Sequence, residues 1–238
     1  MTNAVIFDFD DTLVYTNIIF EQAKNDFYHH MQKMQLADEK IAGILNKFDI
    51  ANVKMSGGLA KDCFPKALRQ TYEYYCGRQN KLVDNKQADF FENLGWHVFE
   101  KETEIIEGAC DLLQRLKPNY KLFLLTQGDY ELQLRRIQKS NLLSYFDHYH
   151  IVHSKTINDF DHLLQTYTID KAQSWSVGNS LRTDILPSLT LGLNTVHIDV
   201  SCWDYEFPED TGDLTKQNLY HNVKNLSECG DIIMGQGV

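Results

Sequence analysis

The sequence predicts an α/β fold: a parallel β-sheet with helices on both faces, interrupted by an inserted all-helical segment. Three observations lead to this prediction. Short apolar runs recur along the chain, helical patterns separate them, and one long segment near the N-terminus contains helical patterns alone. Strands that alternate with helices are typical of parallel sheets, because a parallel connection is long enough to hold a helix.

The first expected strand is the run AVIFDFD, residues 4–10. It is nearly continuously apolar and rich in β-branched and aromatic residues, as is typical of a strand covered on both faces. Four similar runs follow, at residues 120–126, 148–153, 174–178 and 194–198. Together they predict the strands of a parallel sheet with helices on both faces.

Helical patterns lie between these runs, at residues 105–119, 129–142, 158–167 and 182–192. Pro118 and Asn119 are expected to end the first of these helices. From Asp199 onwards the pattern is weaker, and we expect only a terminal helix or strand there.

Residues 15–104 break the alternation. They contain amphipathic patterns at 18–34, 39–48 and 64–76 and no convincing strand. We therefore expect two domains, an α/β core made of residues 1–14 and 105–238 and a helical cap domain made of residues 15–104. The loop from Lys54 to Cys63 contains a Gly-Gly pair, and it is either a finger that brings Lys61 to a substrate or a plain interhelical loop.

Composition limits the classes of function. The formal net charge is -10, with 23 Lys and Arg against 33 Asp and Glu, which argues against a nucleic-acid partner. The five cysteines are scattered and never paired as C-x-x-C, which argues against a disulfide framework and a zinc site. No segment has the ~20 apolar residues needed to cross a bilayer. We expect a soluble, cytoplasmic protein with free thiols.

Two carboxylates, Asp8 and Asp10, come at the end of the first expected strand. Ligands of open parallel sheets bind at the carboxyl ends of the strands. Carboxylates this close repel each other unless a cation lies between them, and oxygen ligands favour Mg²⁺. Alone, the pattern is more often an acidic loop or a helix cap, with Asp11 and Thr12 serving the backbone.

The later strand ends carry groups of complementary chemistry. The second strand ends in Thr126, whose hydroxyl could bind an anion together with backbone N–H groups at the start of the next helix. Lys155 follows the third strand and offers a cation. Asn179 and Asp184 follow the fourth and offer an amide and a carboxylate. Each is ordinary by itself, but in this order they predict a metal-assisted phosphate site.

With these four motifs the chain resembles the haloacid dehalogenase superfamily, in particular its phosphatases with a helical C1-type cap after the first motif. DFDDTL matches the first motif, D-x-D-x-T, and LFLLT matches the second at Thr126. Lys155 matches the third, and GNSLRTD matches the acidic fourth. The resemblance covers nearly the whole chain and implies a Rossmann-like core.

The resemblance implies the chemistry of these positions. Asp8 is the expected nucleophile, which forms an aspartyl-phosphate, and Asp10 is the expected acid/base. The expected phosphate-binding residues are Thr126, Gln127 and Lys155. The expected cofactor is Mg²⁺, with Asp8, Asp184, Asn179 and, through its backbone carbonyl, Asp10 as ligands. The implied activity is hydrolysis of a small phosphorylated metabolite, a phosphomonoester.

Two departures from the family pattern leave alternatives open. Asp11 stands where Gly is common, and Asn179 stands where Asp is most frequent, so the ligand field has one negative charge fewer. A phosphotransferase or mutase, a 2-haloacid dehalogenase and a catalytically impaired phosphate-binding protein remain alternatives. Asp10 argues against dehalogenation, because release of halide needs no general acid. A receiver module is excluded, because it has no ~90-residue insertion after its first strand.

Three histidines lie close together on the third expected strand. His148 and His150 share one face by alternation, and His153 follows them. A transition-metal site is an alternative to packed or solvated side chains. Because no further ligand stands at regular spacing, we expect the latter.

Overall fold

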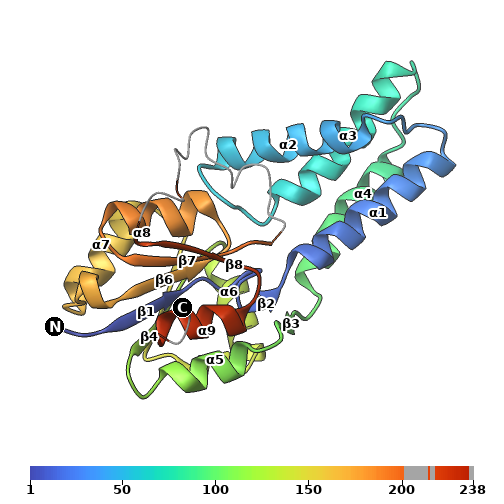
Figure 1. Ribbon diagram of the computed structural model, residues 1–238. Coiled ribbons are helices and arrows are strands. Elements are labelled where there is room, and N and C mark those ends of the chain that lie inside the picture. Colours follow the sequence, from blue (N-terminus) through green and yellow to red (C-terminus); the bar gives the residue numbers. More distant parts are fainter. Residues whose placement is uncertain (201–213, 215–217, 236–238) are drawn as a thin grey trace. The chain divides into compact units, whose positions relative to one another are not determined.

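The computed structural model describes residues 1–200, 214 and 218–235 (Figure 1). Within the described part, the chain forms two compact units. The α/β unit contains Met1–Asn17 and Thr103–Val238, and the helical unit contains Ile18–Glu102.

The α/β unit is built on a six-stranded sheet, counted over the described residues. The strand order is β5-β4-β1-β6-β7-β8, and every neighbouring pair is parallel. The strands are β1 (Ala4–Phe7), β4 (Lys121–Gln127), β5 (His148–Val152), β6 (Trp175–Gly178), β7 (Asn194–Ile198) and β8 (Tyr220–Val223). The predicted parallel α/β fold is confirmed.

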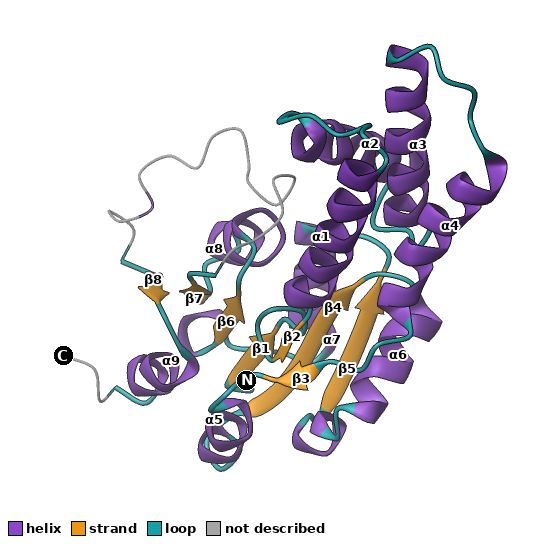
Figure 2. Cartoon of the chain, turned by 90° about the vertical axis from the view of Figure 1, so that its right-hand side faces the viewer, coloured by secondary structure: helices purple, strands orange, loops and turns teal. Residues whose placement is uncertain are grey.

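Both faces of the sheet are covered, which explains the continuous apolar run of β1. Val5 and Phe7 belong to a core shared with α5 (Ala109–Leu116), α6 (Tyr130–Lys139) and α9 (Leu226–Ile233). The intervening residues of β1, Ala4 and Ile6, face a second core that is shared with α7 (Ile157–Thr166). Figure 2 shows α5 and α9 along one side of the strands.

Three crossovers of the sheet have their expected helices. The helix α6 connects β4 to β5, α7 connects β5 to β6, and α8 (Leu186–Thr190) connects β6 to β7. In the described part of the tail, the expectation of a single helix or strand was wrong, because it contains both β8 and α9.

We expected no strand in residues 15–104, but short strands lie at both ends of this segment. A two-residue strand, β2 (Val14–Tyr15), pairs with β3 (Glu104–Ile105) in an antiparallel ladder. The register joins Val14 to Ile105 and Tyr15 to Glu104. This ladder ties the start and the end of the inserted segment together within the α/β unit.

The helical unit contains α1 (Asn17–Lys33), α2 (Ile41–Ser56), α3 (Cys63–Arg78) and α4 (Asn85–Trp96). Its own core is centred on aromatic residues, among them Phe27, Tyr72, Tyr75 and Phe91. The helix α2 continues through Ser56 and ends at Gly57, which has a left-handed φ of 72°. The expected loop from Lys54 is therefore shorter at its start, because Lys54, Met55 and Ser56 are helical.

Within the described residues, no helix is long and apolar enough to span a membrane. Cys63, Cys76, Cys110 and Cys229 are free thiols, as expected. Cys202 lies outside the described residues.

Candidate functional site

The expected site residues come from four neighbouring strand ends. Asp8 directly follows β1, and Thr126 lies one residue before the end of β4. Lys155 follows β5 and Asn179 directly follows β6. Because β5, β4, β1 and β6 are adjacent in the sheet, their carboxyl ends form one edge.

Lys155 joins two carboxylates at this edge. Its Nζ lies 2.6 Å from Asp8 Oδ1 and 2.5 Å from Asp184 Oδ1. All three side chains are buried. One cation therefore faces two carboxylates, and the cluster carries a net negative charge when all three groups are ionised.

The electrostatics of Asp8 reflect this imbalance. Burial and the nearby Asp184 raise the pKa of Asp8 to about 8, and Lys155 opposes the rise. Burial would lower the pKa of Lys155, but the two carboxylates outweigh burial and raise it. A further cation in the cluster would favour the ionised form of Asp8.

Close packing in the turn after β6 sets the position of Asp184. Its Oδ2 accepts the backbone N–H of Ser180 at 2.9 Å. The carboxylate also lies directly against Gly178, where an added Cβ would be 2.3 Å from Asp184 Oδ2. Glycine at 178 is thus a steric requirement of this arrangement, since any larger residue would displace the carboxylate.

The Asp10 carboxylate faces a different set of groups. Its Oδ1 lies 2.6 Å from Arg136 Nη2 and accepts the Thr16 hydroxyl at 2.6 Å, and its Oδ2 accepts Gln133 Nε2 at 2.7 Å. Burial would raise the pKa of Asp10, but Arg136 and the hydrogen bonds from Thr16, Arg136 and Gln133 outweigh it and lower the pKa. The side chain of Asp10 is therefore held as a carboxylate, engaged by protein donors.

Thr126 is connected to Asp10 by an intermediate side chain. Gln133 Nε2 donates to Thr126 Oγ1 at 2.9 Å as well as to Asp10. The side chain of Gln127 accepts the backbone N–H of Lys155 at 3.1 Å, which ties the end of β4 to the loop after β5. Hydrogen bonds thus connect Asp10 to Thr126 through Gln133, and Gln127 to Lys155.

Asp11 serves the backbone. Its Oδ1 accepts the backbone N–H groups of Thr16 and Asn17, both at 2.9 Å, at the point where α1 begins. Its φ of 55° is left-handed, a conformation that Gly adopts without strain and Asp tolerates. Burial raises the pKa of Asp11 to about 6.

Asn179 is 8% exposed and lies beside the first motif, with Thr12 Oγ1 donating to its Oδ1 at 3.4 Å. His197 on β7 contacts its backbone, since the ring Nε2 lies 3.1 Å from the Asn179 carbonyl oxygen. The hydroxyl of Tyr220, on β8, lies 2.9 Å from the other ring nitrogen. Because Nε2 must donate to the carbonyl, Nδ1 of a neutral ring accepts the hydroxyl.

The donor set fits a hard divalent cation. Oxygen donors are available from the carboxylates of Asp8 and Asp184 and from the amide of Asn179, and the buried cluster has two carboxylates for one cation. The Asp10 carboxylate is engaged elsewhere, so this residue can contribute only its backbone carbonyl. Among the described residues, no group of three or more His, Cys, Asp and Glu side chains could hold a metal ion.

The three histidines near β5 do not form such a group either. His148 packs against Tyr167, with ring centroids 4.2 Å apart. His150 Nε2 lies 3.2 Å from the Tyr167 hydroxyl, and burial lowers the pKa of His150. These contacts favour packed histidines, in agreement with the expectation from the sequence.

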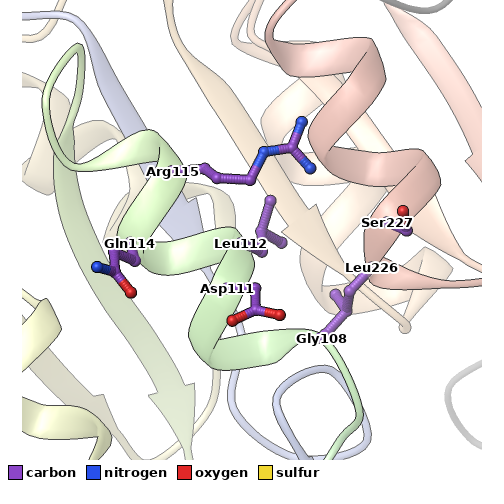
Figure 3. A pocket seen from close by; sticks show the side chains of 7 residues that line it. All are labelled: Gly108, Asp111, Leu112, Gln114, Arg115, Leu226 and Ser227. Atoms are coloured by element: carbon purple, nitrogen blue, oxygen red, sulfur yellow. The ribbon is translucent and has the colours of Figure 1, made fainter.

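A separate depression of about 570 Å³ lies between α5 and α9 (Figure 3). Arg115 lines it and forms an ion pair with Asp231 at 3.1 Å. None of the expected site residues lines this depression, so it is distinct from the cluster around Asp8. The lining residues are Gly108, Asp111, Leu112, Gln114, Arg115, Leu226 and Ser227.

Sequence reasoning missed Gln133, Arg136 and Thr16. The first two belong to a polar helical pattern that by itself indicates a solvated face. The sequence offered one signal: Gln133 stands four residues before the apolar Ile137 and so shares a helix face with it. The structure shows that both residues are buried. A glutamine on the buried face of a helix that follows a motif strand is a candidate for contact with the site.

Comparison with known proteins finds a matching family model and a relative. The family model described as haloacid dehalogenase-like hydrolase matches residues 5–198. The HAD-hydrolase YfnB of Bacillus subtilis (strain 168) is 25% identical over 173 residues, which cover 66% of this chain and 68% of that protein.

Solved structures share the fold over nearly the whole chain. A haloacid dehalogenase-like family hydrolase from Xanthomonas campestris has a TM-score of 0.79 at 17% identity and covers 99% of this chain and 96% of its own. YfnB, solved bound to magnesium, has a TM-score of 0.66 at 16% identity, with 98% of each chain covered.

Two further structures have different activities in their names. A predicted phosphoglycolate phosphatase from Haemophilus somnus 129PT has a TM-score of 0.62 at 15% identity, covering 98% of this chain and 97% of its own. An L-2-haloacid dehalogenase from Xanthobacter autotrophicus has a TM-score of 0.63 at 13% identity, covering 100% of both chains. At these identities the likeness shows the fold alone.

Proposed function

Because the chain belongs to the haloacid dehalogenase-like hydrolases, we propose that it is a Mg²⁺-dependent phosphatase that hydrolyses a small-molecule phosphomonoester through an aspartyl-phosphate. One observation carries the proposal. A second carboxylate, Asp10, stands two residues after the nucleophile Asp8 and is hydrogen-bonded to the side chain that also holds Thr126. Ester hydrolysis needs a proton donor at this place, whereas release of halide does not.

In the first half of the proposed reaction, an oxygen of Asp8 attacks phosphorus and the bond between phosphorus and the ester oxygen breaks. The leaving alcohol takes a proton from Asp10. Donors around Asp10 oppose its protonation, but the negative charge of a bound phosphate monoester opposes the loss of that proton. Substrate binding therefore favours the protonated form that the first step requires.

In the second half, water attacks phosphorus of the aspartyl-phosphate. Asp10, now ionised, takes a proton from this water, and the bond between phosphorus and Asp8 breaks to release inorganic phosphate. Arg136, Thr16 and Gln133 stabilise the ionised form of Asp10 on which this step depends. Together the two half-reactions consume the ester and one water and release the alcohol and inorganic phosphate, so no further reactant is needed.

Phosphate binding is assigned to Thr126, Gln127 and Lys155. The Thr126 hydroxyl donates to a phosphate oxygen, and backbone N–H groups after Thr126 are further donors. Lys155 neutralises charge on Asp8 and on the transferred oxygens, in keeping with its contacts to Asp8 and Asp184.

Mg²⁺ would be held by Asp8, Asp184, Asn179 and the backbone carbonyl of Asp10. When bound, the ion neutralises charge on the phosphate and on the carboxylates around it. The two carboxylates that share the single ammonium of Lys155 support this assignment. Asn179 reduces the charge of the ligand set, and we therefore propose that Mg²⁺ binds with moderate affinity.

A 2-haloacid dehalogenase is the second candidate, since one structural neighbour carries that activity in its name. The presence of Asp10 favours the phosphatase, because only ester hydrolysis needs a proton donor. The two activities also differ in their product, which is inorganic phosphate for one and halide for the other. Purified protein should be assayed for inorganic phosphate with a panel of phosphorylated metabolites and an aryl phosphate, with and without Mg²⁺. In parallel it should be assayed for halide with 2-chloropropionate.

We expect Mg²⁺-dependent phosphate release and no halide release. Asp8→Asn should lower kcat at least 1,000-fold (an order-of-magnitude expectation for loss of a nucleophile) and leave the circular dichroism spectrum unchanged. Release of halide, or activity retained in Asp8→Asn, would refute the assignment. Phosphate that is transferred to a second metabolite rather than released would instead indicate a mutase.

A further inference from the structure

The side chain of Gln133, on α6, connects two groups of the proposed active site. Its Nε2 lies 2.7 Å from Asp10 Oδ2 and 2.9 Å from Thr126 Oγ1. Gln133 is 2% exposed, so water does not compete freely for these contacts. An amide nitrogen carries two hydrogens and can donate to both oxygens at once.

Arg136 fixes the direction in which the Gln133 amide faces. A guanidinium only donates, and an ionised carboxylate only accepts. Arg136 Nη1 lies 2.6 Å from Gln133 Oε1, so the amide nitrogen must face Asp10. The opposite orientation would place the amide nitrogen against Arg136 and the amide oxygen against the carboxylate, which leaves both contacts repulsive.

Arg136 is itself held on several sides. Its Nη2 lies 2.6 Å from Asp10 Oδ1 and 2.6 Å from Thr16 Oγ1. Its guanidinium carbon lies 5.7 Å from the centre of the Phe9 ring. The guanidinium is therefore fixed by contacts with the loop after β1 as well as by its own helix.

These contacts have consequences for both site residues. Each oxygen of the Asp10 carboxylate accepts a hydrogen bond, so rotation of the carboxylate breaks at least one of them. Thr126 Oγ1 accepts from Gln133, and its own hydrogen is left to donate to another acceptor, such as a phosphate oxygen. One amide thus orients a proton-transfer group and a phosphate-binding group together.

We infer that Gln133 is a positioning residue that holds the side chains of Asp10 and Thr126 in fixed positions relative to each other. Arg136 fixes the Gln133 amide in the orientation that these two contacts require. The inference rests on the proposed phosphatase function, because it needs a leaving alcohol that receives a proton. Neither residue has to touch the substrate. Their three-residue spacing on α6 places both on the face of the helix that meets the site.

The test compares Gln133→Met with Gln138→Met, a matched change at an exposed position of the same helix. Steady-state kcat and KM are measured for 4-nitrophenyl phosphate and for an alkyl phosphate that the wild-type protein hydrolyses. Nitrophenolate leaves without protonation, whereas an alkoxide does not. A residue that positions the general acid should therefore matter more for the alkyl ester.

We expect Gln133→Met to lower kcat/KM for the alkyl phosphate about tenfold more than kcat/KM for the aryl phosphate. The inhibition constant of inorganic phosphate should rise several-fold, because the Thr126 hydroxyl is no longer oriented. Gln138→Met should match the wild type in both respects. In an Asp10→Asn background, Gln133→Met should no longer change the ratio of the alkyl to the aryl rate.

Two further variants guard against a folding defect. Gln133→Glu keeps the volume of the side chain but removes the donor, and it should reproduce the change in the ratio. Arg136→Met should lower the ratio of the alkyl to the aryl rate. Arg136→Lys keeps a cation beside Asp10 and should lower this ratio less. Thermal unfolding of every variant shows that the rates are compared between folded proteins.

An equal loss of kcat/KM for both esters in Gln133→Met and Gln133→Glu would overturn the inference, because kcat/KM reports the step in which the alcohol leaves, and an equal loss would indicate a structural role alone. In that case wild-type turnover would still support the proposed function. If the wild type and Gln138→Met release no phosphate from any ester in Mg²⁺, the proposed function fails, and the inference fails with it.

Discussion

The three acidic residues after β1 have different surroundings, and their chemistry differs accordingly. Asp8 shares the ammonium of Lys155 with Asp184, and both carboxylates are buried. Asp10 is held by donors from α6 and by Thr16. Asp11 accepts backbone N–H groups at the start of α1. A run of like residues thus divides into three settings, which suit the proposed nucleophile, the proposed acid/base and a helix cap.

The surroundings of Asp11 predict a pH-dependent contribution to stability. Its folded pKa of about 6 exceeds the ordinary value of 3.8, so the folded state retains a proton that the unfolded state loses. Stability should fall as pH rises from about 4 to about 6, by roughly 1–3 kcal/mol from this group. Asp11→Asn accepts the same N–H groups, tolerates a left-handed φ and does not titrate.

We therefore expect Asp11→Asn to match the wild type near pH 4 and to be more stable by ~1 kcal/mol or more at pH 7.5. Urea unfolding at the two pH values measures this difference, and subtraction of the wild type removes the effect of other titrating groups. A variant that is less stable than the wild type at pH 7.5 would show that the negative charge of Asp11 is needed.

Residues at the strand ends could be located from sequence, whereas residues that reach the site from a helix could not. The pattern of strands places Asp8, Thr126, Lys155 and Asp184 at one edge, because the carboxyl ends of parallel strands meet there. Gln133 was not located, because helical spacing shows that a residue shares a face with its neighbours but not which strand end that face meets. Tertiary structure supplies this information.

At the scale of elements, the helical unit depends on one close approach. An added Cβ at Gly95, on α4, would lie 2.5 Å from the backbone Cα of Pro65, on α3. Backbone atoms cannot yield as a flexible side chain can. The two helices therefore pack in direct contact at this glycine, and a larger residue must separate them.

Gly95→Ala should destabilise the helical unit by about 1–3 kcal/mol, the usual cost of overpacking. Gly43→Ala is the control, because a Cβ on this residue of α2 meets no atom within 4 Å and Ala favours helix. The control should be neutral or stabilising by up to about 1 kcal/mol. Thermal unfolding monitored by circular dichroism compares the two. Equal stability of the variants would contradict the packing described here.

Element prediction succeeded where hydrophobic patterns are strong and failed where they are weak. The five apolar runs are all strands, because buried parallel strands are apolar on both faces. The strand β8 was not found, since it is an edge strand with the polar sequence YHNV and only Val223 fully buried. The ladder of β2 and β3 has two residues in each strand, too short for any periodicity to show.

For the whole molecule, binding of a divalent ion should add to stability. The chain has a formal net charge of -10, and the cluster around Lys155 concentrates negative charge in a buried place. At a free Mg²⁺ concentration tenfold above the dissociation constant, binding stabilises the folded state by about 1.4 kcal/mol. For a chain of this length, that corresponds to a rise in Tm of roughly 3–5 °C.

The rise in Tm with Mg²⁺ should disappear in Asp184→Asn and increase in Asn179→Asp, which adds a negative charge to the proposed ligand set. Ca²⁺ and K⁺ titrations serve as comparisons for size and charge. An unchanged rise in Asp184→Asn would place the ion elsewhere. These measurements need no substrate and therefore test the metal ligands independently of activity.

The central claim is that Asp8 becomes phosphorylated during turnover. The direct measurement is to quench the protein in acid during turnover of a phosphate ester with Mg²⁺, reduce it with borohydride and identify the modified peptide by mass spectrometry. The account predicts conversion of residue 8 to homoserine, dependent on both ester and Mg²⁺ and absent in Asp8→Asn. Phosphate release with Asp8 unmodified, or modification at another carboxylate, would contradict it.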